Sequence, residues 1–217
     1  MAVKLGPGWC GSIVNATIPF CSITTPGGIG YVKGACISSR KYAKSTYDVA
    51  VSEIGKSFKG VLVSAHEVGH LIGAYHDGVD EAADCPKNSG FIMSYTRHNA
   101  SMFSRFSECS KRSIRHFLSK IWYSKCLRET SDAGYTYPEL LPGQYMPISD
   151  QCREYSNGFP CPSQSAEERC QKLCCENNVY RIFRREPAVD GTKCGLGMMC
   201  MNGACIPSSK LKVLPWI

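Results

Sequence analysis

Apolar residues recur at helical spacing in two segments of the chain. One stripe of the first predicted helix consists of Val61, Ala65, Val68 and Ile72. Gly73 follows it, at the position where helices commonly end in a left-handed residue. The second predicted helix covers Ser107–Lys125, and its apolar face consists of Ile114, Phe117, Leu118, Ile121 and Trp122. We expect both apolar faces to pack on the core of one domain.

Two short strands are predicted before the first helix. Residues 28–36 have the pattern of a short strand punctuated by glycines. Residues 47–54 are the second, because Tyr47, Val49 and Val51 alternate there with polar or small residues. Residues 55–60 are a predicted turn that leads into the helix. The first part of the chain therefore combines helices and strands.

The chain changes character after residue 128. From 129 to 151, glycines and prolines break any periodicity, which predicts a linker or an extended wrap. Eight cysteines then crowd into 152–205 with little apolar periodicity. Such a segment buries little core and depends on covalent cross-links. The predicted organisation is a first domain over 1–130, a linker over 131–151 and a cysteine-rich module over 152–217.

Cysteine usage indicates the compartment. The chain has 14 cysteines, an even number, and N-glycosylation sequons begin at Asn15 and Asn99. Both features favour an extracellular compartment with structural disulfides. No apolar run approaches the roughly 20 residues that span a bilayer, so we expect no membrane span. Residues 1–21 lack the apolar stretch of a signal peptide, so we expect either a longer precursor or a fragment.

The net charge of +7 is unevenly distributed. One segment holds eight basic residues against the single acidic residue Glu108: Arg97, Arg105, Lys111, Arg112, Arg115, Lys120, Lys125 and Arg128. These side chains form either the solvated face of a helix or a patch that attracts acidic glycans or an acidic protein. An extracellular location argues against a nucleic-acid partner.

Three histidines have the spacing of a catalytic zinc site. His66 and His70 lie four residues apart, so a helix directs both imidazoles to one centre. A left-handed Gly73 lets the chain turn back and bring His76 to the same centre. Three neutral imidazoles leave a fourth position for water, as in catalytic rather than structural zinc sites. Glu67 lies beside the metal, where the general base for that water is expected.

The segment 66–77 resembles the metzincin signature His-Glu-x-x-His-x-x-Gly-x-x-His, and Ile92-Met93-Ser94-Tyr95 resembles the Met-turn of that clan. Asp77 after the third histidine is similar to the adamalysin, or reprolysin, branch. The resemblance implies an α+β, zincin-like catalytic domain with zinc as its cofactor. It also implies structural support of the site by Gly73, Asp77 and Met93, with Met93 as the apolar floor. Ser94 and Tyr95 then help wall the substrate pocket.

The resemblance extends to the substrate strand and the disulfides. Gly28–Val32 resembles the family's edge strand, where an extended substrate adds as a further strand. Its implied substrate-binding residues are Gly28, Ile29, Gly30 and Tyr31. The implied bridges are Cys36 with Cys126, Cys85 with Cys109, and Cys10 with Cys21.

The tail is similar to the disintegrin-like module of metalloproteases that carry thrombospondin motifs. Matching segments include residues 137–143, Asp190-Gly191-Thr192-Lys193-Cys194 and Cys200-Met201-Asn202-Gly203-Ala204-Cys205. There is no Arg-Gly-Asp, so integrin binding by that route is not supported. Taken together, the chain is most similar to the secreted metalloproteases of tick saliva.

The chain departs from the family before the zinc helix. Only 65 residues precede His66, whereas the family's catalytic domains begin well before that helix. We therefore expect an N-terminally truncated domain whose central sheet lacks most of its strands. A structural Ca²⁺ site is left open, because its upstream acidic ligands would lie in the missing part.

Two functions from different classes follow. The first is a secreted zinc endopeptidase that hydrolyses extracellular or plasma proteins by a water activated by Glu67. The alternative is a non-catalytic fragment that binds a host or matrix protein through the cysteine-rich tail and the basic helix. An intracellular zinc peptidase is disfavoured by the 14 cysteines.

Overall fold

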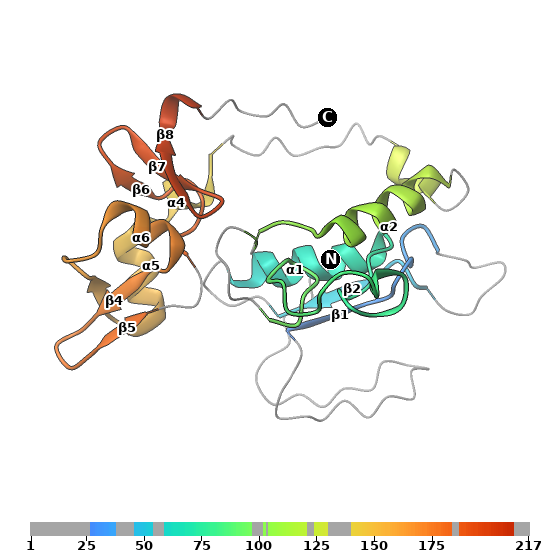
Figure 1. Ribbon diagram of the computed structural model, residues 1–217, viewed down its shortest axis with the longest axis horizontal. Helices are drawn as coiled ribbons and strands as arrows, with labels where there is room; N and C mark the ends of the chain where they lie inside the picture. The colour runs from blue at the N-terminus through green and yellow to red at the C-terminus, as the bar shows by residue number, and fades with distance from the viewer. Residues whose placement is uncertain are drawn as a thin grey trace.

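The computed structural model describes residues 27–37, 46–53, 59–96, 102, 104–120, 124–129, 140–183 and 187–210. Figure 1 shows two groups of elements, one around α1 and α2 and one formed by the C-terminal helices and hairpins. Cys10, Cys21, Asn15 and Asn99 lie outside the described residues. Among the described helices, none is long and apolar enough to cross a bilayer.

A two-stranded antiparallel sheet lies against the first helix (Figure 1). β1 (Gly28–Gly30) pairs with β2 (Ala50–Ser52), with Gly28 opposite Ser52 and Gly30 opposite Ala50. β1 is shorter than the predicted strand 28–36, because Lys33 has a φ of 61° and turns the chain. The Lys33 amide then donates to the His70 carbonyl oxygen at 2.9 Å, which attaches the loop after β1 to the end of the helix.

The first helix, α1 (Lys59–Leu71), buries the predicted apolar stripe only in part, with Ala65 packed against the core of Ala74, Ile92 and Met93. Val61 and Val68 of the expected apolar stripe are 55% and 49% exposed, so that part of the prediction is wrong. The buried face carries Glu67 and His70 instead, because β1 on one side and residues 91–96 on the other enclose it. The helix therefore buries its functional face.

The second helix, α2 (Glu108–Ser119), starts as predicted and ends six residues early. Ser107 is its N-cap, and the hydroxyl oxygen of Ser107 accepts a hydrogen bond from the Ser110 amide. Phe117 is buried, but Leu118 of the expected apolar face is 38% exposed. A 3₁₀ turn, η2 (Lys125–Arg128), follows, and a second one, η1 (Asp80–Ala82), precedes α2 in the chain.

The C-terminal module consists of short elements cross-linked by disulfides. Its helices are α4 (Pro142–Tyr145), α5 (Ile148–Ser156) and α6 (Ala166–Gln171), with the 3₁₀ turn η3 (Ser208–Lys210). One antiparallel sheet has the order β3 (Phe159–Pro160), β4 (Cys174–Glu176) and β5 (Arg181–Phe183). The other has the order β6 (Lys193–Gly195), β7 (Met198–Met201) and β8 (Ala204–Pro207).

The expected linker 131–151 overlaps this module. α4 and the first part of α5 lie within it, and the Gly143 amide donates to the Asp190 carbonyl oxygen at 2.8 Å. The Gln151 side chain donates to the Thr192 hydroxyl, also at 2.8 Å. Residues 142–151 are therefore packed on residues 189–192 rather than extended between two units.

Candidate metal centre and cleft

Three imidazoles converge at the end of α1. The Nε2 atom of His76 lies 3.0 Å from Nε2 of His66 and 3.3 Å from Nε2 of His70. His66 and His70 reach this point from one face of α1, one helical turn apart. The structure therefore brings together the three residues that the sequence predicts as metal ligands.

His76 reaches the centre because the chain reverses at Gly73. This glycine has a φ of 107°, a left-handed conformation that disfavours a side chain. Its amide donates to the His70 carbonyl oxygen, and the Ala74 amide donates to that of Gly69. These bonds close the helix end in the way left-handed C-terminal residues do. The next turn of chain then carries His76 back across the end of α1.

The donor set fits a zinc ion. Zn–N bonds of about 2.0–2.1 Å in a tetrahedron require neighbouring nitrogens about 3.3–3.4 Å apart, close to the separations seen here. Nδ1 of His66 and of His70 each lie 2.8 Å from a carbonyl oxygen, of Ile92 and Ala74 respectively. Donation from Nδ1 leaves the Nε2 lone pair free to face the centre, as in the outer shell of many metal sites.

Electrostatics favour the neutral imidazoles that a metal needs. Burial lowers the pKa of His70. Burial and the neighbouring His70 also lower the pKa of His76. Three neutral rings with nitrogen atoms aimed at one point have lone pairs that only a shared proton or a cation satisfies. Zinc binding is therefore compatible with both the geometry and the protonation of the cluster.

Glu67 lies in a cleft between α1 and β1. The cleft has a volume of about 460 Å³ and is lined by residues of β1, by Glu67 and by the three histidines. The Glu67 side chain is 5% exposed, and burial raises its pKa to about 7. A carboxylate with a pKa near neutrality is suited to taking up and releasing a proton.

The glycines of β1 make room for that carboxylate, a role that the sequence analysis missed. A Cβ atom at Gly28 would lie 2.7 Å from Cγ of Glu67 and 2.8 Å from its Oε1. A Cβ atom at Gly30 would lie 2.9 Å from the Glu67 backbone oxygen and 3.2 Å from its Oε2. Positions 28 and 30 share one face of the strand. The Gly-x-Gly spacing was visible in the sequence, but its partner on the helix was not.

Met93 packs against α1 next to the second histidine. It is fully buried in a small core with Ala74 and Ile92, and Phe106 packs against this core. A Cβ atom at Gly69 would lie 3.0 Å from its sulfur. Since Gly69 directly precedes His70, the position of Met93 is coupled to that of the second histidine.

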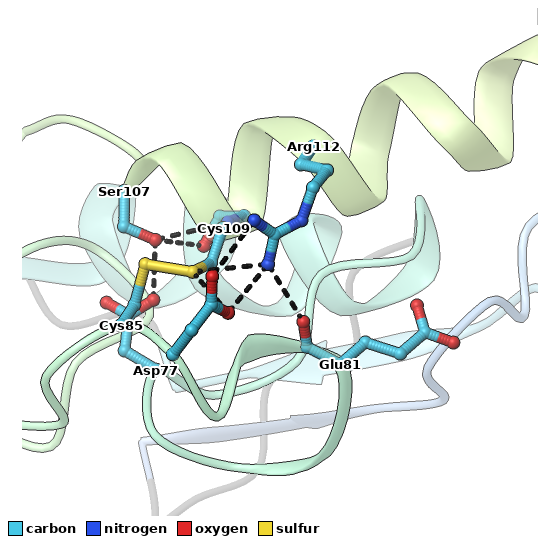
Figure 2. Close-up of polar contacts among 8 residues, drawn as sticks. Asp77, Glu81, Cys85, Ser107, Cys109 and Arg112 are labelled. Carbon is cyan, nitrogen blue, oxygen red and sulfur yellow. Dashed lines mark hydrogen bonds and ion pairs between the residues drawn. A yellow bond between two sulfur atoms is a disulfide. The ribbon is translucent and has the colours of Figure 1, made fainter.

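Asp77 connects the site to α2. Its buried carboxylate accepts hydrogen bonds from the hydroxyls of Ser94, at 2.8 Å, and Ser107, at 2.5 Å. Ser107 is also the N-cap of α2, so the carboxylate lies where the helix dipole favours negative charge. The Asp77 backbone amide donates to the Met93 carbonyl oxygen. Figure 2 shows Asp77 below Ser107 at the start of the helix.

A second set of contacts holds residues 81–85, in the loop that follows Asp77, against α2. Cys85 and Cys109 form a disulfide between the loop and α2 (Figure 2). The guanidinium of Arg112 pairs with both oxygens of Asp84, at 2.7 and 3.0 Å, and donates to the Glu81 carbonyl oxygen. Another disulfide joins Cys36 to Cys126. Both bridges are the pairings that the family resemblance implies.

The predicted substrate-binding residues lie in different places. Gly28, Ile29 and Gly30 line the cleft. Tyr31 is exposed and packs edge-on against Tyr47, outside the cleft lining. Tyr95 lies beside the cleft lining, with its ring centre 5.0 Å from that of His76. Ser94 is buried, and its hydroxyl donates to the Asp77 carboxylate. It therefore lies in a supporting position and does not line the cleft.

The chain matches known families along most of its length. Residues 10–120 match the model of the reprolysin-like metallo-peptidase family M12B, and residues 142–206 match that of the ADAMTS cysteine-rich domain 2. A silkworm (Bombyx mori) "A disintegrin and metalloproteinase with thrombospondin motifs like" protein is 37% identical over 189 residues, which cover 82% of this chain and 26% of the relative.

Two mammalian relatives show the same similarity. Human "A disintegrin and metalloproteinase with thrombospondin motifs 18" is 36% identical over 156 residues, or 70% of this chain and 12% of the relative. Cattle (Bos taurus) "A disintegrin and metalloproteinase with thrombospondin motifs 5" is 32% identical over 162 residues, or 68% of this chain and 73% of that sequence. The chain spans about a quarter of the silkworm relative and about an eighth of the human one.

Proposed function

Because the chain belongs to the reprolysin-like metallopeptidase family M12B and carries an ADAMTS-type cysteine-rich domain, we propose that it is a secreted zinc endopeptidase that hydrolyses extracellular proteins. The proposal rests on one observation above all. Three imidazole Nε2 atoms converge at the edge of a cleft whose wall contains the buried carboxylate of Glu67. A purely structural histidine cluster has no need of an adjacent buried carboxylate in an open cleft.

His66, His70 and His76 would hold the zinc ion. A bound zinc ion supplies Lewis-acid chemistry, which activates water and polarises a peptide carbonyl. Glu67 takes the proton of the attacking water and delivers it to the leaving amine. β1 aligns an extended substrate beside the Glu67 carboxylate, because a peptide can pair with an exposed strand edge. Burial of the carboxylate keeps bulk water from competing for that proton.

The finer identity of the protein is part of the proposal. We expect extracellular or plasma proteins as substrates, with acidic glycans or matrix proteins as further partners. Similarity to tick salivary metalloproteases, a disintegrin-like character of the module, glycosylation at Asn15 and Asn99 and a Ca²⁺ requirement stay predictions.

The alternative, a non-catalytic binding module, has one observation in its favour. Phe159 and Phe183 are exposed on the sheet β3–β4–β5, and Nζ of Lys172 lies 5.4 Å from the centre of the Phe183 ring. Exposed aromatic side chains beside cations are frequent in protein interfaces. This surface is compatible with a binding role in either function.

The test is cleavage of a fibrinogen- or matrix-derived peptide mixture by the zinc-loaded chain. We expect activity that a zinc chelator abolishes and that Glu67→Ala lowers by a factor of roughly 10²–10⁴, with zinc still bound at one ion per chain. Glu81→Gln is the matched control, because Glu81 is also acidic but lies outside the cleft lining. A folded chain that binds zinc and cleaves nothing would contradict the proposal and favour the binding module.

A further inference from the structure

The cleft extends past the histidines to a group of residues without a role in the proposed reaction: Val32, Tyr75, Val79 and Asp80. Val32 follows β1, and the other three flank His76 in the chain. The Val79 amide donates to the His76 carbonyl oxygen at 3.2 Å, and the Ala83 amide donates to that of Asp80 at 3.1 Å. This end of the cleft is therefore built on the same turn as the third histidine.

The charge of this end differs from that of the whole chain. The chain has a net charge of +7, yet no lysine or arginine occurs among the described residues that line the cleft. Asp80 is exposed, and the described ion pairs do not include it. Its neighbour Glu81 is paired with Lys33 at 2.5 Å. Lys33, the cation that lies over Tyr75 of the cleft lining, is thus paired with Glu81, and Asp80 supplies a negative charge at the cleft.

The other three residues of this group contribute apolar groups to the cleft lining. Val32 and Val79 contribute aliphatic groups and Tyr75 an aromatic ring, while Nζ of Lys33 lies 5.2 Å from the centre of the ring. Aliphatic and aromatic groups in the same cleft as a carboxylate are complementary to a long aliphatic stem with a cationic head. Lysine and arginine are the side chains with that shape and charge.

We propose that Val32, Tyr75, Val79 and Asp80 form a subsite for a lysine or arginine side chain of the substrate, in which the Asp80 carboxylate pairs with the cation. The inference rests on the proposed peptidase function, because it places the subsite beside the bond that is cleaved. A glutamate or aspartate at the same substrate position is disfavoured, since its carboxylate would face that of Asp80. The cleft would then select substrates by charge as well as by strand pairing.

The test uses short peptide hydroxamates, which anchor to zinc and need no catalysis. The two peptides of a pair differ at one position, where one carries lysine and the other norleucine, its uncharged analogue. Successive pairs place this difference at successive positions of the peptide. We expect the lysine peptide to bind the zinc-loaded chain roughly three- to tenfold more tightly at one position. Asp80→Asn should remove that preference, and 1 M salt should reduce it. Asp48→Asn, the same substitution at an exposed aspartate outside the cleft lining, should retain it.

The outcomes separate the two proposals. Tight binding of both peptides without a lysine preference at any position would overturn the subsite and leave the zinc site standing. A preference that persists in Asp80→Asn, or that Asp48→Asn removes equally, would also overturn it. If neither peptide binds, the zinc centre itself has failed, and the proposed function fails together with the subsite.

Discussion

The two halves of the molecule are stabilised in different ways. Around the histidines, the apolar core is small, and a buried carboxylate, Asp77, joins the segments that surround it. In the C-terminal module, most of the core residues are themselves cysteines in disulfides: Cys152, Cys170, Cys175, Cys194 and Cys200. The first half therefore combines two disulfides with polar contacts in defined geometry, while in the second half the disulfides themselves form most of the core.

The largest expected effect comes from opening a bridge in the module. Cys152→Ala with Cys175→Ala removes a disulfide that closes 23 residues and whose sulfurs are fully buried. Loop entropy predicts a loss of about 3.5 kcal/mol, and the lost core contacts add roughly 1–2 kcal/mol. We expect the module to unfold, as measured by loss of hydrogen-exchange protection in residues 142–207.

A matched control exists in the other half. Cys85 and Cys109 close 24 residues, so the loop-entropy contribution is almost the same. Cys85→Ala with Cys109→Ala should cost less, because the Arg112–Asp84 pair and Asp77 still hold α2 to the loop. Equal losses in both double variants would mean that the two halves depend on their disulfides alike, which contradicts the comparison.

The next effect concerns the buried carboxylate. Asp77→Ala leaves the hydroxyls of Ser94 and Ser107 without their acceptor in a buried site. We expect the free energy of unfolding of this half to fall by about 2–4 kcal/mol, measured by chemical denaturation of the zinc-loaded chain. Zinc affinity should fall about tenfold, because the segment held through Ser94 also contains Ile92, whose carbonyl oxygen orients the His66 ring.

Ser107→Ala is the comparison for this prediction. It removes one hydrogen bond to Asp77 and the N-cap of α2, which together contribute about 1–2 kcal/mol. If Asp77→Ala costs no more than Ser107→Ala, the carboxylate does not organise this half of the molecule.

A smaller effect is expected at the turn before His76. Gly73→Ala places a Cβ atom on a residue with a φ of 107°, 2.8 Å from Cβ of Phe117. We expect a loss of about 1–3 kcal/mol and weaker zinc binding, measured by calorimetric titration. Gly197→Ala is the control, since Gly197 also has a positive φ, of 65°, but no atom within 4 Å of the added Cβ. Gly197→Ala should lower the free energy of unfolding by about 1 kcal/mol. A similar loss at both positions would mean that backbone strain alone, and not the contact with Phe117, causes the effect of Gly73→Ala.

Gly73 also shows how much the sequence could predict. The spacing of His66, His70 and His76 requires a helix and then a sharp reversal, and both are local properties of the chain. The convergence of the three imidazoles and the left-handed glycine therefore agree with the expectations from local spacing, whereas the buried Met93 was expected only from the family resemblance. Short-range periodicity is sufficient where neighbouring residues build the site.

The missed features depend on contacts between distant segments. Val61 and Val68 have helical spacing, but the fold covers α1 on the side of Glu67 and His70 and leaves both valines exposed, so their periodicity was misleading. The fit of Glu67 against Gly28 joins residues 39 positions apart, and no local pattern encodes it. Residues 142–151 have no periodicity, yet they pack on the turn at 189–192 through backbone and amide hydrogen bonds. Such pairings are fixed by tertiary structure alone.

The smallest expected effect tests whether the module contains an unfavourable buried charge. Burial raises the pKa of Asp190, although its Oδ1 accepts a hydrogen bond from the Asn202 amide at 2.8 Å. A carboxyl whose pKa is higher in the fold binds its proton more tightly there than in the unfolded chain. The free energy of unfolding therefore falls as pH rises from the ordinary value near 3.8 through the raised pKa.

Asp190→Asn keeps an oxygen acceptor for the Asn202 amide and removes the charge. At neutral pH, well above the ordinary pKa of aspartate, we expect the variant to melt at a higher temperature than the native chain. Below the ordinary pKa of aspartate, where the carboxyl is protonated in both states, the two melting temperatures should coincide. Asp150→Asn, which removes the same charge from a surface ion pair with Arg153, should give no such gain at neutral pH. A neutral-pH loss in Asp190→Asn would mean that the charged hydrogen bond to Asn202 outweighs burial, so that this half too depends on a buried carboxylate.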